Sequence, residues 1–240
     1  MKAPQGTNAQ KGETCTMRIN WSVYEAHAEH LASLVDTFAK KRKALMDPMY
    51  SLEYQQEQVR KLRDDVKPKV WETLAGIRAQ VEKDAEAARY RPPEMTPEER
   101  AAHFAERTYW ATVLPDTLAS MGPDAILAEY ERVAKAGSPA QKAEFERVAE
   151  RLLAEKGSVG HRARFGELKR AAMSPEEKEA ERAQAAVETI SFYYGWLEHQ
   201  TRNALELIEN GGTLDTRPLA QWAATVRKKV EQAADKGKAS

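Results

Sequence analysis

Cysteine is nearly absent from this chain, since Cys15 is the only one in 240 residues. A single thiol excludes a disulfide within the chain and any metal site built from several thiolates. Long apolar runs are missing as well: none reaches the ~18 residues that span a bilayer, and the first 20 residues have no apolar centre of the kind that a secretory signal needs. We therefore expect no membrane contact and a location in the cytoplasm, or in a particle assembled there.

A net charge is also absent. Lys and Arg together number 37, and so do Asp and Glu. No overall field therefore steers the protein toward nucleic acid, anionic lipid or an acidic substrate, and such binding would require a local patch of charge. The chain also lacks segments of alternating apolar and polar residues enriched in β-branched side chains, so we expect no β-strand.

Signatures of catalysis are not found either. There is no Gly-x-Ser-x-Gly elbow and no phosphate-binding loop, and no histidine follows an acidic residue by three positions, as in a di-iron bundle. His27 and His30 are three residues apart and could share a helix face, the minimum geometry for the metal site of a metal-dependent enzyme, with Glu29 as a further ligand. The preferred interpretation is two partly exposed polar positions. We expect a protein that is not an enzyme, without catalytic, cofactor-binding or metal-binding residues.

The chain does contain well-marked helix starts. Three segments share the pattern Ser or Thr, Pro, any residue, Glu or Gln, namely Thr96–Glu99, Ser138–Gln141 and Ser174–Glu177. The hydroxyl accepts a hydrogen bond from a backbone N–H of the first turn, Pro fits the first helical position, and Glu or Gln reaches back to the cap. Each segment therefore predicts a helix that begins at its proline.

Apolar periodicity predicts the other helices. In chain order, the expected helices run from Trp21 to before Pro48, over 51–66, from the first cap to Pro115, from Pro123 to Gly137, from Ser138 to Gly157, from Pro175 to about Glu209, and from Pro218 onward. Pro68 either kinks the second helix or starts another, whose stripe continues to Val81. Residues 157–173 are expected to form a basic connection with one helical turn.

These elements predict an all-α fold, an extended bundle of six to eight helices that includes long, heptad-patterned helices. Residues 1–18 carry too little apolar surface to order, so a flexible amino-terminal arm is expected. Two prolines between Arg89 and Pro93 mark the clearest break in the first half. The predicted organisation is an arm at 1–18, a helical region at 19–91, and a second region at 92–240 with the three capped helices.

The expected helix at 175–209 carries more aromatic surface than one face holds. Its aromatic side chains from Phe192 to Trp196 spread over about 200° of the circumference, wider than the ~100° stripe of an ordinary surface helix. Core packing within the chain is the preferred interpretation, and an interface with another subunit is the alternative. The interface candidates are Phe192, Tyr193, Trp196 and Trp222. Gly195 would let another backbone approach.

The densest basic run consists of Lys40, Lys41, Arg42 and Lys43, at the carboxyl end of the first helix. Cations are favoured there because they complement the helix dipole. With the basic residues up to position 69 and the cluster at 227–229, the run could instead contact phosphates. Interspersed acidic residues favour the first interpretation.

The leading hypothesis is a non-enzymatic structural or assembly protein. It would act through helix-to-helix contacts with other protein subunits in a homo- or hetero-oligomer or a larger particle, for example as a phage structural or scaffolding component. The alternative is a nucleic-acid-associated helical protein that uses the basic clusters at 40–69 and 227–229. Neither hypothesis requires a cofactor.

Overall fold

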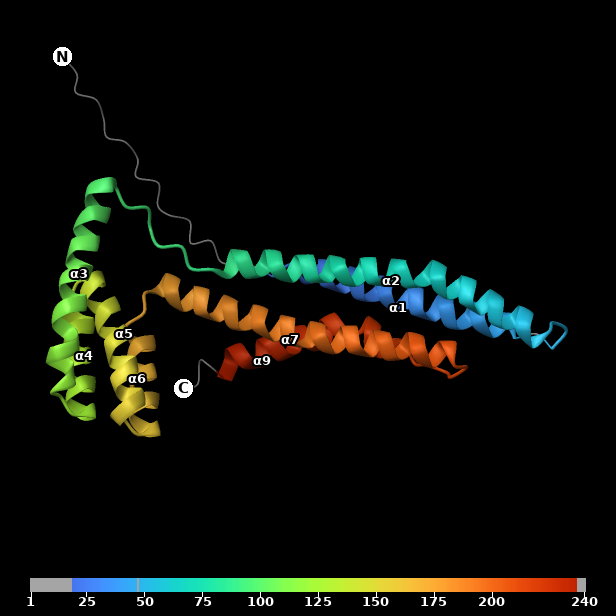
Figure 1. Cartoon of the computed structure of the whole chain (residues 1–240). Helices are drawn as coiled ribbons and strands as arrows, with labels where there is room; N and C mark the ends of the chain where they lie inside the picture. Colours follow the sequence, from blue (N-terminus) through green and yellow to red (C-terminus); the bar gives the residue numbers. More distant parts are fainter. Residues whose placement is uncertain (1–18, 47, 237–240) are drawn as a thin grey trace, which may run out of the picture. The chain divides into compact units, whose positions relative to one another are not determined.

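The computed structural model describes residues 19–46 and 48–236, and this part of the chain contains nine α-helices and no strand (Figure 1). The helices are α1 (Trp21–Leu45), α2 (Leu52–Ala88), α3 (Pro97–Ala119), α4 (Pro123–Ala136), α5 (Pro139–Lys156), α6 (Val159–Ala171), α7 (Pro175–Glu209), α8 (Arg217–Ala220) and α9 (Trp222–Lys236). The prediction of an all-α, multi-helix fold is confirmed. The predicted arm at 1–18 lies outside the described residues.

The chain divides into two compact units. The first unit comprises Met1–Arg89 and Glu179–Ser240, and the second unit comprises Tyr90–Lys178. The predicted regions, 19–91 and 92–240, differ from this division because the carboxy-terminal helices share a core with α1 and α2. The local breaks in a sequence do not indicate which distant segments pack together.

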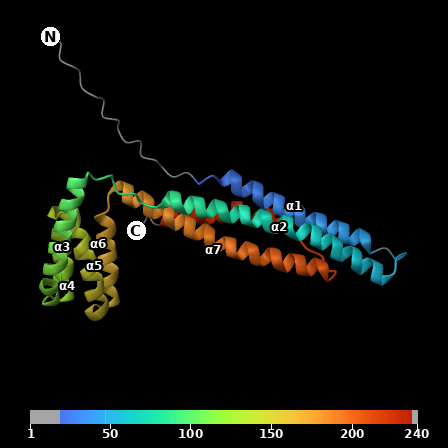
Figure 2. The same cartoon turned by 45° about the horizontal axis from the view of Figure 1, so that its top comes forward.

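The first unit is built on an antiparallel pair, α1 and α2, which lie side by side in Figures 1 and 2 with α7 running alongside. Its core joins residues of α1, α2, α7, α8 and α9. At one end of the pair the buried Tyr24 hydroxyl donates to Asp84 at 2.7 Å, and Gln80 donates to the same carboxylate at 2.8 Å. Burial and this contact with Asp84 raise the pKa of Tyr24, so the hydroxyl stays protonated and remains a donor.

The second unit contains α3, α4, α5 and α6 around a separate core. Its centre is the ring of Tyr130, which lies 5.7 Å from the ring of Phe145 and meets that of Phe165 edge-on at 4.9 Å. The Tyr130 hydroxyl donates to Glu146 at 2.5 Å, which satisfies the one polar atom of this side chain.

The predicted helix starts are confirmed. Thr96 and Glu99 form a full capping box, and Ser138 accepts from the backbone N–H of Gln141. Ser174 accepts from the N–H of Glu177, whose carboxylate accepts from the N–H of Ser174. These contacts are short-range, so the sequence pattern alone is enough to predict them.

The prediction for residues 157–173 is wrong, because most of this segment is the 13-residue helix α6. Its start is a capping box in which His161 occupies the place of Glu or Gln. The imidazole Nδ1 accepts from the Ser158 N–H at 3.0 Å, and the Ser158 hydroxyl accepts from the His161 N–H. Phe165 is the buried anchor of α6, and a single anchor gives little periodic signal.

Two prolines lie inside helices. Pro68 is within α2, so of the two alternatives predicted for it, the start of a separate helix is excluded. Pro115 is within α3, so the predicted end at Pro115 is wrong. An interior proline removes a backbone hydrogen bond. In both helices buried residues flank the proline, Val66 and Val70 in the first case and Leu114 and Leu118 in the second; this packing offsets the loss.

One carboxylate of the second unit is buried between two cations. Glu144 accepts from Arg107 at 2.5 Å and from Arg147 at 2.7 Å. Burial acts to raise the pKa of Glu144, but the hydrogen bonds from both guanidinium groups outweigh it and hold the pKa below its ordinary value of 4.5.

This shift predicts that the second unit loses stability in acid. A carboxyl group whose pKa is lower in the folded state stabilises the fold fully above its unfolded pKa, near 4.5, and the contribution disappears as the pH falls through the folded value. Urea unfolding of the second unit between pH 3 and 7 should show this decline, and Glu144→Gln should flatten it. Equal pH dependence in both proteins would contradict the assignment.

Candidate functional site

The candidate site is a groove on the first unit, between α7 and the segment of α8 and α9. It has a volume of about 240 Å³ and is lined by Tyr193, Trp196, Pro218, Gln221, Trp222 and Thr225. The indole N–H of Trp222 donates to the backbone carbonyl of Tyr193 at 2.9 Å, which ties α9 to α7. We call this groove between α7 and the α8–α9 segment the aromatic groove.

The four interface candidates divide into buried and exposed side chains. Trp222 is 1% exposed, and Tyr193 is partly buried against the core. Phe192 is 75% exposed and Trp196 is 42% exposed. Since they are four residues apart, these two aromatic side chains lie on the same face of α7, and the Phe192 ring also meets that of Tyr193 edge-on at 5.4 Å.

Gly195 lies beside Trp196 on the exposed surface of α7. A Cβ atom built on Gly195 would have no other atom within 4 Å, apart from its chain neighbours and the backbone of its own helix. The helix therefore offers open space at Gly195, next to the exposed Trp196. On the opposite wall of the groove, Trp222 was among the interface candidates, whereas Pro218, Gln221 and Thr225 were not predicted from the sequence. These three recur at helical spacing, and this periodicity could have indicated them.

The basic run of α1 is partly neutralised by its surroundings. Lys40 forms an ion pair with Asp36 at 2.6 Å. The guanidinium of Arg42 lies over Gly211, at the carboxyl end of α7, 2.9 Å from the position that a Cβ atom would take there. Lys41 and Lys43 are exposed.

Other cations of the proposed phosphate-binding clusters also face acidic residues on their own helices. The ion pairs are Lys61 with Glu57 at 2.7 Å, Lys69 with Asp65 at 2.8 Å, and Arg227 with Glu231 at 3.0 Å. The hydrogen bond from Lys61 lowers the pKa of Glu57, and that from Lys69 lowers the pKa of Asp65, so both carboxylates keep their charge at neutral pH. Nucleic-acid binding therefore stays the less supported proposal.

The histidine pair does not converge on a common site. The His27 ring packs against Gly76 of α2, where an added Cβ atom would lie 2.8 Å from it, and His30 is exposed. Among residues 19–46 and 48–236, no three His, Cys, Asp or Glu side chains are grouped so that they could hold a metal ion. The helices of this same part of the chain include none that is long and apolar enough to cross a membrane.

No protein-family model, curated protein or solved structure matches this chain. What the protein does is therefore inferred from its own side chains.

Proposed function

We propose that this protein is a non-enzymatic structural or assembly protein that binds other protein subunits through the aromatic groove and the exposed face of α7. The observation that carries the proposal is the exposure of Phe192 and Trp196 beside this groove. Large aromatic side chains are enriched at the centres of protein interfaces, where each buries about 150–250 Å². A partner helix would place an apolar side chain in the groove and pack along α7.

Substitution of the exposed pair tests this proposal. Phe192→Ser combined with Trp196→Ser should weaken subunit association at least tenfold, because central aromatic residues contribute about 2 kcal/mol or more each. Light scattering after gel filtration, over a series of protein concentrations, measures the association. The matched control is Phe104→Ser on α3, because Phe104 is 71% exposed and lies in the second unit.

Three results would contradict the proposal in different ways. An unaltered chain that stays monomeric at every concentration would exclude a homo-oligomer. A double variant that associates as well as the unaltered chain would exclude this surface as the interface. Loss of association in Phe104→Ser alone would place the interface on the second unit.

Gly195→Ala should raise the stability of the first unit but weaken its association with a partner. Alanine is favoured over glycine within a helix by about 0.5–1 kcal/mol, and the space around Gly195 is open, so the first unit should become more stable. A partner backbone that approaches at Gly195 would meet the new methyl group, so association should weaken. Gly166→Ala, in equally open space on α6, is the control for urea unfolding and light scattering: it should stabilise the second unit and leave association unchanged.

A further inference from the structure

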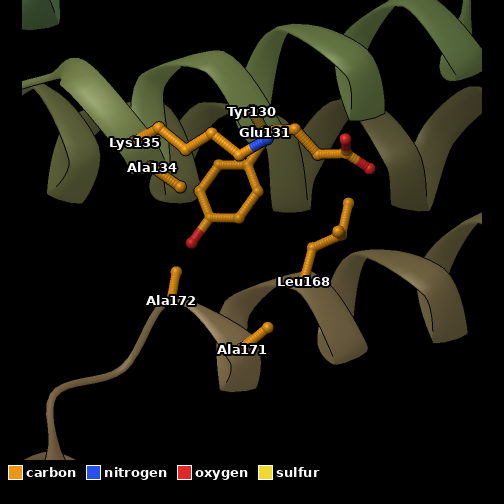
Figure 3. Close-up of a pocket in the computed structure, with 7 residues that line it drawn as sticks. All are labelled: Tyr130, Glu131, Ala134, Lys135, Leu168, Ala171 and Ala172. Carbon is orange, nitrogen blue, oxygen red and sulfur yellow. The ribbon is translucent and has the colours of Figure 1, made fainter.

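The second unit has its own groove, between α4 and α6 (Figure 3). It has a volume of about 390 Å³ and is lined by Tyr130, Glu131, Ala134, Lys135, Leu168, Ala171 and Ala172. Binding sites for small molecules commonly occupy about 300–1,000 Å³ and are mostly apolar. We call this site the α4–α6 groove.

The groove exists because small side chains line both of its walls. Ala134 on α4 and Ala171 and Ala172 at the end of α6 leave space that longer side chains would fill. The Tyr130 ring is completely buried and is held by two other aromatic rings and by its hydrogen bond to Glu146. Since this ring is fixed, the groove is preformed and a ligand would order little of it on binding.

The charges at the groove favour an anion. Lys135 is exposed, and its ammonium group has no hydrogen-bond or ion-pair partner within the described part of the chain. The carboxylate of Glu131 also lines the groove. Arg164 Nη2 lies 3.8 Å from it, but the same guanidinium lies 3.2 Å from Glu167 and is shared between the two carboxylates. Lys135 is therefore the one ion of the groove lining without a partner in the described part of the chain, and its ammonium group is available to a ligand anion.

We propose that the α4–α6 groove binds a small amphipathic anion, with an apolar body against Leu168 and the alanines and one carboxylate or sulfonate group on Lys135. The apolar lining supplies most of the affinity because the groove removes hydrocarbon from water. Lys135 sets the preference for an anion. This site lies wholly within the second unit and does not depend on the aromatic groove.

The test uses the full chain and anilinonaphthalene sulfonate, a fluorescent apolar anion, with decanoate as a competitor. We expect saturable binding of one probe per chain that decanoate displaces. Ala134→Leu fills the groove from α4 and should weaken binding at least tenfold, whereas Ala128→Leu, on the exposed face of the same helix, should leave the affinity unchanged. Ala171→Leu fills the groove from α6 and gives the same test if Ala134→Leu does not fold.

The charge is tested separately. Lys135→Gln should weaken probe binding by about two- to fivefold, the range for an exposed ion pair, and Arg151→Gln, which removes an exposed cation from the same unit, should not. The proposal is overturned if no saturable binding occurs, if decanoate fails to compete, or if the folded groove-filling variants bind as the unaltered chain does. If the unaltered chain binds no probe and the groove-filling variants associate more weakly with other subunits, the groove binds a protein partner. That result would also overturn the proposal.

Discussion

Replacing Trp222 with alanine is expected to lower the free energy of unfolding of the first unit by about 3–5 kcal/mol. The side chain is 1% exposed, and its ring lies 6.1 Å from that of Tyr24. Its removal leaves a cavity between α1, α7 and α9 and takes the indole donor from the carbonyl of Tyr193. Urea unfolding followed by amide hydrogen exchange and mass spectrometry would measure the loss in α1, α2 and α9.

Phe192→Ala is the matched control, since Phe192 is also aromatic and belongs to the same unit but is 75% exposed. This substitution should change the free energy of unfolding of the first unit by at most about 0.5 kcal/mol, as most surface substitutions do. Comparable losses in the two variants would contradict the division of the aromatic candidates into buried and exposed members. Equal loss of protection in α4 and α5 on replacing Trp222 would contradict the separation of the two cores.

Local interactions explain why α7 could be predicted from the sequence. Its start depends on Ser174 and Glu177, three residues apart, and its end on the Gly211 and Gly212 backbone N–H groups, which bond to the carbonyls of Ile208 and Leu207. Gly211 has a φ of 90°, which glycine adopts without strain. Thr201, a polar residue in the apolar register, is buried because its hydroxyl donates to the carbonyl of Leu197.

The two units could not be predicted because their cores join segments that are far apart in the chain. Tyr24 of α1 contacts Asp84 of α2 and the Trp222 ring of α9. No local pattern marks either pair, since a buried tyrosine requires an acceptor but does not indicate which one. The sequence could therefore predict most helix starts, but not the return of the chain to the first unit after Lys178.

The candidate site was predicted only in part, because it also depends on a contact between segments that are far apart in the chain. Helical periodicity placed all the aromatic residues of α7 on one wide band, and this band did not indicate which side α9 covers. The indole of Trp222 contacts Tyr193 and helps to cover that side, while Phe192 and Trp196 remain exposed. A contact between helices, rather than any feature of α7 alone, creates the groove.

Phe145→Ala is the complementary substitution, and it should lower the free energy of unfolding of the second unit by about 3–5 kcal/mol. Phe145 is fully buried, and its ring lies 5.7 Å from that of Tyr130. The loss of the ring leaves a cavity beside a side chain that joins α4, α5 and α6. Hydrogen exchange in these three helices should accelerate, while α1, α2 and α9 keep their protection.

Phe104→Ala controls for the loss of an aromatic side chain from this unit, because Phe104 is 71% exposed, and it should cost at most about 0.5 kcal/mol. Combining Phe145→Ala with Trp222→Ala then tests whether the cores are independent. Substitutions in separate cores should have additive effects within about 0.5 kcal/mol. A larger deviation would show that the continuous helix α7 couples the two units, since α7 begins in the second unit and continues through the first.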